Sequence, residues 1–216
     1  MEIKMNQRGK FIVFEGIDGS GKSTQIKLLS KTFEKHNIEY HSTLEPTYGL
    51  VGETLHDILS GKIKADPKVT ASLFVADRLD HILNEKDGLL NTINSGKTVI
   101  CDRYYFSSYA YQSVEVPREW VISANRLAAD TLKPDVTIFI DIPAEVAMER
   151  ISKNRDNIEL YENLERLTAV RDGYFSAFEL LKNEENIFVV NGNQPPEKIA
   201  EEIENYIFKT LFLVNV

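Results

Sequence analysis

The stretch that decides the fold reads FIVFEGIDGSGKST and runs from residue 11 to residue 24. Its first part, Phe11–Phe14, is solidly apolar, which is typical of a strand covered on both faces of a parallel sheet. Its second part, Gly16–Ser23, matches the pattern G-x-x-x-x-G-K followed by Ser or Thr, and a helical pattern follows it. Strand, glycine-rich loop and helix in this order predict a phosphate-binding loop in an α/β protein.

The residue types in this loop suit a nucleoside triphosphate. Glycines permit positive φ angles, which let backbone N–H groups approach a phosphate closely. The helix that follows adds unpaired N–H groups and the positive end of its dipole. Lys22 is long enough to reach the β- and γ-phosphates, and the Ser23 hydroxyl is a ligand for Mg²⁺. The predicted nucleotide-binding residues are Gly16, Asp18, Gly19, Ser20, Gly21, Lys22, Ser23 and Thr24.

The alternation of strand and helix continues along the chain. Apolar runs predict further buried strands at Val99–Cys101, Val136–Ile140 and Ile187–Val190, and the more alternating Glu39–Leu44 predicts a strand nearer an edge. Helical patterns lie between these runs. The prediction is one five-stranded parallel sheet with helices on both faces, a three-layer α/β/α fold whose ligands bind at the carboxyl ends of the strands.

Length and composition limit the classes of protein to which this chain can belong. The 216 residues fit one domain, and we see no repeat or linker, so residues 1–216 are predicted to form a single domain. The net charge of −8 disfavours nucleic acid as a partner. Cys101 is the sole cysteine, which excludes an intramolecular disulfide and suits a reducing cytosol. Without a membrane-length apolar run or a secretory signal, we expect a cytoplasmic protein without membrane attachment.

A charged pair follows the strand predicted at Val99–Cys101. Asp102 would lie beside the loop, where a carboxylate can hold Mg²⁺ together with Ser23, directly or through water. The planar guanidinium of Arg103 can bind a second phosphate through two parallel hydrogen bonds. A solvated Asp–Arg pair at a turn is the alternative. The site is favoured because folds of this class place their ligands at strand ends.

Six stretches together resemble the thymidylate kinase family of P-loop nucleoside monophosphate kinases. The loop alone is shared by many enzymes, whereas its combination with the other stretches is more selective. The resemblance covers nearly the whole chain and implies ATP and Mg²⁺ as cofactors, phosphorylation of dTMP to dTDP on the route to dTTP, and a homodimer. The stretches are Phe14–Gln25, Glu45–Gly49, Leu73–Arg78, Asp102–Gln112, Lys133–Asp135 and Tyr161–Glu162.

The resemblance also implies which residues bind the base of the acceptor nucleotide. It implies that Phe74 stacks on thymine, that Arg78 donates to a base carbonyl and that Ser108 reads the base edge. Phe74 and Arg78 are four residues apart, so on a helix they share one face. Taken alone, Phe74 is more simply a core aromatic residue.

Four further residues are assigned by resemblance to the sugar and phosphate of the acceptor. Tyr111 would pack near the 2′ carbon, where a ribose hydroxyl would be buried without a partner. Asp18 would meet the 3′-hydroxyl, although it also suits a turn. Arg103 would bind the acceptor phosphate with Tyr48 nearby, although Tyr48 also suits a surface loop. Many members of the family have arginine where this chain has Leu44. Binding of the acceptor phosphate is therefore expected to depend more on Arg103 and Tyr48.

A basic segment near residues 150–160 resembles the family's mobile lid. The glycine-rich loop has no added Arg or Lys, so the helper cations are expected in the lid, with Arg150 and Arg155 favoured over Lys153 for their planar forks. Closure of a lid excludes water from the reaction. Tyr161 would approach the sugar or a metal-bound water. The alternatives are a solvated loop between helices and an ordinary helix start.

The expected reaction needs orientation and charge neutralisation more than covalent chemistry. The residues predicted to act in it are Lys22, Asp18, Arg103, Arg150 and Arg155. Another deoxynucleotide or deoxynucleoside kinase is the nearest alternative, although a nucleoside kinase has no use for Arg103. A P-loop switch or ATPase module is a more distant one, and the N-K-x-D motif that reads guanine is absent. A structural protein would have no use for Gly16–Ser23.

Overall fold

The computed structural model describes residues 8–152 and 160–212. Five parallel strands form one sheet in the order β2-β3-β1-β4-β5, which confirms the predicted fold class. The glycine-rich loop follows the central strand. The strands are β1 (Phe11–Glu15), β2 (Tyr40–Leu44), β3 (Thr98–Asp102), β4 (Val136–Asp141) and β5 (Ile187–Asn191).

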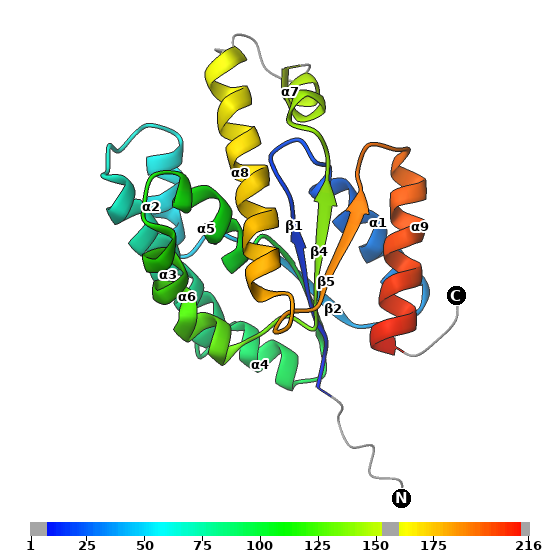
Figure 1. Ribbon diagram of the computed structural model, residues 1–216. Helices are drawn as coiled ribbons and strands as arrows, with labels where there is room; N and C mark the ends of the chain where they lie inside the picture. The colour runs from blue at the N-terminus through cyan, green and yellow to red at the C-terminus, as the bar shows by residue number, and fades with distance from the viewer. Residues whose placement is uncertain (1–7, 153–159, 213–216) are drawn as a thin grey trace, which may run out of the picture.

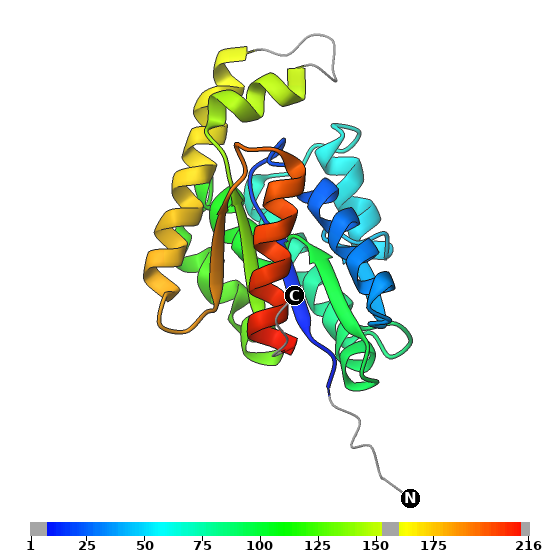
Figure 2. The same ribbon diagram turned by 90° about the vertical axis from the view of Figure 1, so that its right-hand side faces the viewer.

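Helices cover both faces of this sheet, which gives three layers (Figures 1 and 2). Helices α1 and α9, with the short π-helix η2, pack on one face, whereas α3, α4, α5, α6 and α8 pack on the other. The helices are α1 (Lys22–Lys35), α2 (Leu50–Leu59), α3 (Pro67–Leu83), α4 (Leu89–Asn94), α5 (Tyr105–Tyr111), α6 (Arg118–Thr131), α7 (Ala144–Ser152), α8 (Leu160–Leu181) and α9 (Pro196–Ile207), with η1 (Gln112–Val114) and η2 (Phe208–Phe212).

The central strands are apolar throughout because each contributes to two cores. On β1, Phe11 and Val13 enter the core beneath α3–α8, and Ile12 and Phe14 enter the core beneath α1 and α9. The edge position of β2 agrees with its alternating sequence. The prediction that Ile187–Val190 is covered on both faces holds in part: Ile187 packs against one core and Val190 lies in the other, but Val189 is exposed on β5, the other edge strand of the sheet.

The parallel register brings the carboxyl ends of β1, β3 and β4 together, since Phe14 lies opposite both Asp102 and Ile138. The loop before α1, the end of β3 and the segment after β4 therefore meet at the carboxyl end of the sheet. Figure 1 shows the loop after β1 and the segment after β4 side by side there. Within the described residues, no helix is both long and apolar enough to cross a membrane.

Candidate active site

The glycine-rich loop has the backbone that its sequence predicts. Gly16, Gly19 and Gly21 all have positive φ angles, of 148°, 79° and 101°. Gly21 precedes the first turn of α1, so the helix N-terminus opens directly into the loop. The Lys22 ammonium donates to the carbonyl oxygens of Gly16 at 3.0 Å and Ile17 at 3.4 Å. Burial, reinforced by the charge of Arg103, lowers the pKa of Lys22 to about 8.

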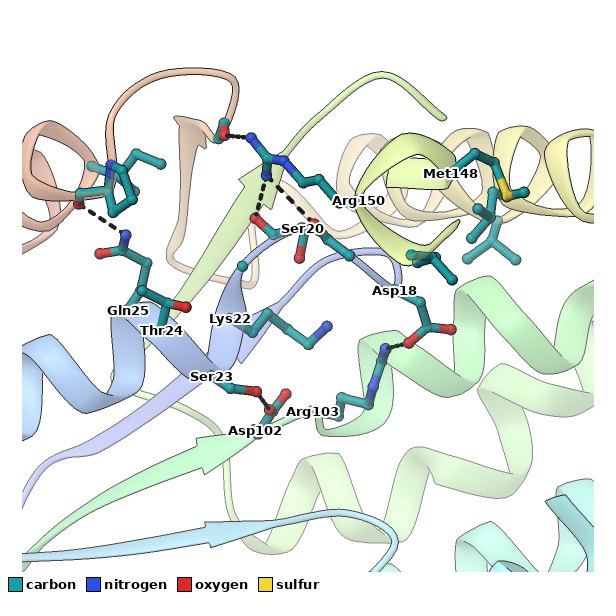
Figure 3. A pocket seen from close by; sticks show the side chains of 18 of the residues that line it. Asp18, Ser20, Lys22, Ser23, Thr24, Gln25, Asp102, Arg103, Met148 and Arg150 are labelled. Atoms are coloured by element: carbon teal, nitrogen blue, oxygen red, sulfur yellow. Dashed lines mark hydrogen bonds and ion pairs between the residues drawn. The ribbon is translucent and has the colours of Figure 1, made fainter. Parts of the chain in front are cut away.

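A cleft of about 1150 Å³ lies around this loop (Figure 3). Every predicted loop residue except Gly16 lines it. The other walls come from the end of β3, the turn after β5, and helices α2, α5, α7, α8 and α9. Figure 3 shows the Lys22 side chain pointing into the space between Ser23, Asp102, Asp18 and Arg103. The predicted donor site and the predicted Asp102–Arg103 pair therefore share one cavity.

Ser23 and Asp102 lie close enough to share a cation. The Ser23 Oγ donates to Asp102 Oδ2 at 3.5 Å. The other carboxylate oxygen, Asp102 Oδ1, is buried and has no hydrogen-bond partner in the described part of the chain. A buried carboxylate oxygen without a donor is costly unless another group binds it. Carboxylate and hydroxyl oxygens are ligands that Mg²⁺ prefers, so these residues fit the predicted metal.

Two predicted residues, Asp18 from the loop and Tyr111 from α5, meet at Arg103. Its Nη2 atom lies 2.7 Å from Asp18 Oδ1 and donates to the Tyr111 hydroxyl at 3.2 Å. The guanidinium also lies over the Tyr111 ring, 4.8 Å from its centroid, and the Asp18 N–H donates to the same hydroxyl. Burial opposes ionisation of Asp18, but the charges of Arg103 and Lys22 outweigh it and lower the pKa of Asp18.

Arg103 rests on a buried network that sequence reasoning missed. Its Nη1 atom donates to Ser107 Oγ at 3.1 Å and to the Tyr174 hydroxyl at 3.4 Å. Both hydroxyls also bind Glu15, a fully buried carboxylate at the end of β1. Burial raises the pKa of Glu15, and the hydrogen bond from Ser107 and the charge of Arg103 oppose that shift. A glutamate ending an otherwise apolar strand was the available sequence signal; nothing in the sequence marked Tyr174.

Arg78 and Ser108, both predicted for the base of the acceptor, are in direct contact. The Arg78 side chain is 1% exposed, and its Nη1 donates to Ser108 Oγ at 3.0 Å and to Asn125 Oδ1. Its Nε donates to Glu45 Oε2 at 2.8 Å. Glu45 lies in one of the matched stretches, but no sequence signal pointed to Asn125, which approaches from α6.

The other predicted acceptor residues lie apart from the loop. Phe74 is half-buried on α3, one turn before Arg78. Tyr48 is 73% exposed and stacks on the His56 ring with centroids 4.8 Å apart. The described residues that line the cleft do not include Tyr48, Phe74, Arg78 and Ser108.

Arg150 lies at the cleft in the last turn of α7. Its Nη2 donates to the Gly192 carbonyl at 3.0 Å, and its Nη1 to the carbonyls of Gly19 and Ser20 at 3.4 Å each, as Figure 3 shows. Arg150 thus links α7, the glycine-rich loop and the turn after β5. Arg166 on α8 also lines the cleft. The sequence did not predict it, because it lies outside the basic segment near residues 150–160.

Residues 153–159 of the predicted lid fall outside the described residues. Lys153 and Arg155 belong to that part of the chain. The Tyr161 side chain is also outside the described part, although its backbone is in the first turn of α8. Their predicted roles therefore remain predictions.

Comparison with known proteins gives one consistent result. The family model for thymidylate kinase matches residues 14–203. A thymidylate kinase of Clostridium novyi is 37% identical over 207 residues, which cover 93% of this chain and 98% of that protein. A probable thymidylate kinase of Methanocaldococcus jannaschii is 40% identical over 198 residues, covering 91% and 93%. A thymidylate kinase of Ligilactobacillus salivarius is 35% identical over 202 residues, covering 90% and 95%.

Proposed function

Because this chain belongs to the thymidylate kinase family, we propose that it transfers the γ-phosphoryl group of ATP to dTMP, forming dTDP on the route to dTTP. The observation that carries the proposal is that the glycine-rich loop faces Asp102 and Arg103 across a shared cleft. A loop that suits the donor phosphates and a partly buried arginine that suits an acceptor phosphate meet there, as a kinase of a phosphorylated acceptor requires.

The donor half of the site is assigned to the loop and its neighbours. Backbone N–H groups of Asp18–Thr24 and the N-terminus of α1 would hold the ATP phosphates, with Lys22 among them. Ser23 and Asp102 would hold Mg²⁺, which neutralises phosphate charge when bound. The turn that contains Gly192 would take the adenine, and Arg150 already joins that turn to the loop.

The acceptor half is assigned to Arg103 and the residues around it. Arg103 would bind the dTMP phosphate, Asp18 the 3′-hydroxyl, and Tyr111 would pack against the 2′ carbon. Arg78 and Ser108 would read the base, where Ser108 accepts from Arg78 and so keeps its own proton for a base acceptor. Phe74 would stack on thymine and Tyr48 would approach the phosphate.

Phosphoryl transfer then depends on alignment. An oxygen of the acceptor phosphate attacks the γ-phosphorus in line as the bond to the bridging oxygen of ADP breaks, without an enzyme-bound intermediate. Lys22, Arg103 and Arg150 supply positive charge around the two anions. The proposed lid near residues 150–160, with Arg155 and Tyr161, would exclude water.

An acceptor series tests this proposal directly. ADP release with ATP and Mg²⁺ is measured with dTMP, dUMP, dCMP, dGMP, thymidine and no acceptor. Turnover with dTMP and none with thymidine is expected, because Arg103 needs a phosphate. Preference for thymidine would assign a nucleoside kinase. Equal ADP release with and without acceptors would indicate an ATPase or switch module.

We also propose a cytoplasmic homodimer built as a single domain. Large apolar side chains are exposed on α3 and α6, two helices that pack side by side. They include Val69 and Leu83 on α3 and Trp120 and Leu127 on α6. Exposed apolar groups on adjacent helices are typical of surfaces that associate.

A further inference from the structure

Arg103 has a backbone conformation that costs energy to hold. Its φ angle is 72°, in the left-handed region that long side chains rarely adopt. Its backbone N–H donates to the Phe14 carbonyl at 2.9 Å, which ties the residue to β1. This conformation fixes where the side chain starts, but the guanidinium at its far end needs support of its own.

That support comes from two hydroxyls and a carbonyl. The Arg103 Nη1 atom faces the oxygens of Ser107 and Tyr174, and it also lies 3.3 Å from the Gly16 carbonyl oxygen. Ser107 comes from α5 and Tyr174 from α8, so two helices meet at this nitrogen. The opposite nitrogen, Nη2, remains turned toward Asp18 and the cleft.

Glu15 sets the direction of both hydroxyls. Its Oε1 accepts from the backbone N–H groups of Tyr104 at 2.8 Å and Ser107 at 3.1 Å. Its Oε2 accepts from Ser107 Oγ at 2.6 Å and the Tyr174 hydroxyl at 2.7 Å. Each hydroxyl has one proton, and the hydrogen bonds to Oε2 assign both protons to the carboxylate, although the two hydroxyl oxygens also lie within hydrogen-bond distance of each other, at 2.9 Å. The lone pairs of both oxygens are therefore left for Arg103, which can only donate.

We propose that Glu15, acting through Ser107 and Tyr174, is a positioning residue that fixes the Arg103 guanidinium for the acceptor phosphate. The inference rests on the proposed function, in which Arg103 binds that phosphate. Glu15 lies outside the cleft lining and touches no substrate in this arrangement. Glu15 leaves the Ser107 and Tyr174 oxygens free to accept hydrogen bonds from Arg103 Nη1. With Nη1 held by these oxygens, the other nitrogen, Nη2, faces the cleft.

Glutamine at position 15 would reverse this polarity at nearly constant shape. The two backbone N–H groups can only donate, so the amide oxygen must face them and the amide nitrogen must face the hydroxyls. One hydroxyl could then donate to the other, 2.9 Å away, but the remaining proton would turn toward Arg103 Nη1, which is also a donor. Tyr174→Phe and Ser107→Ala each remove one link without changing charge.

The test compares dTMP with thymidine, which lacks the phosphate. Binding of each to the full chain is measured by titration calorimetry for Glu15→Gln, Tyr174→Phe and Ser107→Ala. We expect dTMP to bind about tenfold more weakly, as loss of one charge-assisted hydrogen bond implies, with thymidine changed less than about twofold. Tyr105→Phe is the matched control, because it removes another buried tyrosine hydroxyl, one that donates to Glu185 away from the cleft.

Three results overturn the inference. Equal weakening of dTMP and thymidine would assign the network a purely structural role, and unchanged dTMP binding in all three variants would assign it none. A dTMP-specific loss in Tyr105→Phe would show that any buried hydroxyl has this effect. Arg103→Lys separates the inference from its premise: if it also leaves dTMP binding unchanged, the proposed role of Arg103 fails first.

Discussion

Replacing Glu45 by glutamine isolates the charge of a buried ion pair. Glu45 accepts from Arg78 Nε through Oε2 and lies 3.1 Å from His81 Nδ1 through Oε1. In Glu45→Gln the amide oxygen can still accept from Arg78 while the amide nitrogen faces the ring nitrogen of His81. The variant therefore keeps shape and hydrogen bonds but leaves the Arg78 cation without its counter-charge.

The structure sets the size of the effect. Arg78 and Glu45 are 1% and 3% exposed, so solvent cannot replace the lost carboxylate. Removing one partner of a buried pair typically costs about 3–5 kcal/mol, and the retained hydrogen bonds place this variant near 3 kcal/mol. For a chain of this length that corresponds to a melting temperature roughly 6–12 °C lower.

Urea unfolding at pH 7 measures the loss, and a double variant tests its cause. Arg78→Met alone should also destabilise the chain, because it leaves Glu45 unpaired. Glu45→Gln with Arg78→Met buries no charge, so it should lose much less than the sum of the single variants. Asp130→Asn, at an exposed pair with Arg126, is the control and should leave the midpoint unchanged. Additive losses, within about 0.5 kcal/mol, would refute the charge argument.

Three further predictions concern the loop, a helix contact and assembly. Lys22→Met should abolish turnover yet stabilise the nucleotide-free chain by roughly 3 kcal/mol at pH 7, because a pKa lowered to about 8 marks an unfavourable buried charge. Between about pH 8 and 10.5 the unfolded wild-type chain binds more protons than the folded one, so wild-type stability rises with pH. In urea titrations across this pH range, the stability of the wild type should therefore approach that of the variant. Gly52→Ala should destabilise by about 2 kcal/mol or more in thermal melts, since its Cβ would lie 2.0 Å from the Thr47 carbonyl oxygen. Gly49→Ala meets only side-chain oxygens, the nearer at 3.2 Å, and should be tolerated. Leu127→Glu should shift the chain toward monomer in light scattering without unfolding it, and an unchanged mass would remove α6 from the interface.

The local features of this protein follow from its sequence by itself. Phe11–Phe14 and Gly16–Ser23 determine a buried strand and a phosphate-binding turn, because apolar runs and glycine spacing act on residues adjacent in the chain. The sheet could be predicted for the same reason. The position of Asp102 beside the loop could also be predicted, since the carboxyl ends of parallel strands lie at the same end of the sheet. The likeness of the other stretches to thymidylate kinases supplied candidates for the acceptor site.

Only the tertiary structure decided which side chains become partners. Ile187–Val190 has the sequence of a strand covered on both faces, yet it is an edge strand of the sheet and its Val189 side chain is exposed. Glu15 and Tyr174 are 159 residues apart, and Arg78 and Asn125 are 47 apart. Such pairs depend on how helices dock against the sheet, and no local pattern reports that docking. A buried charge must find its hydrogen bonds wherever packing places the donors.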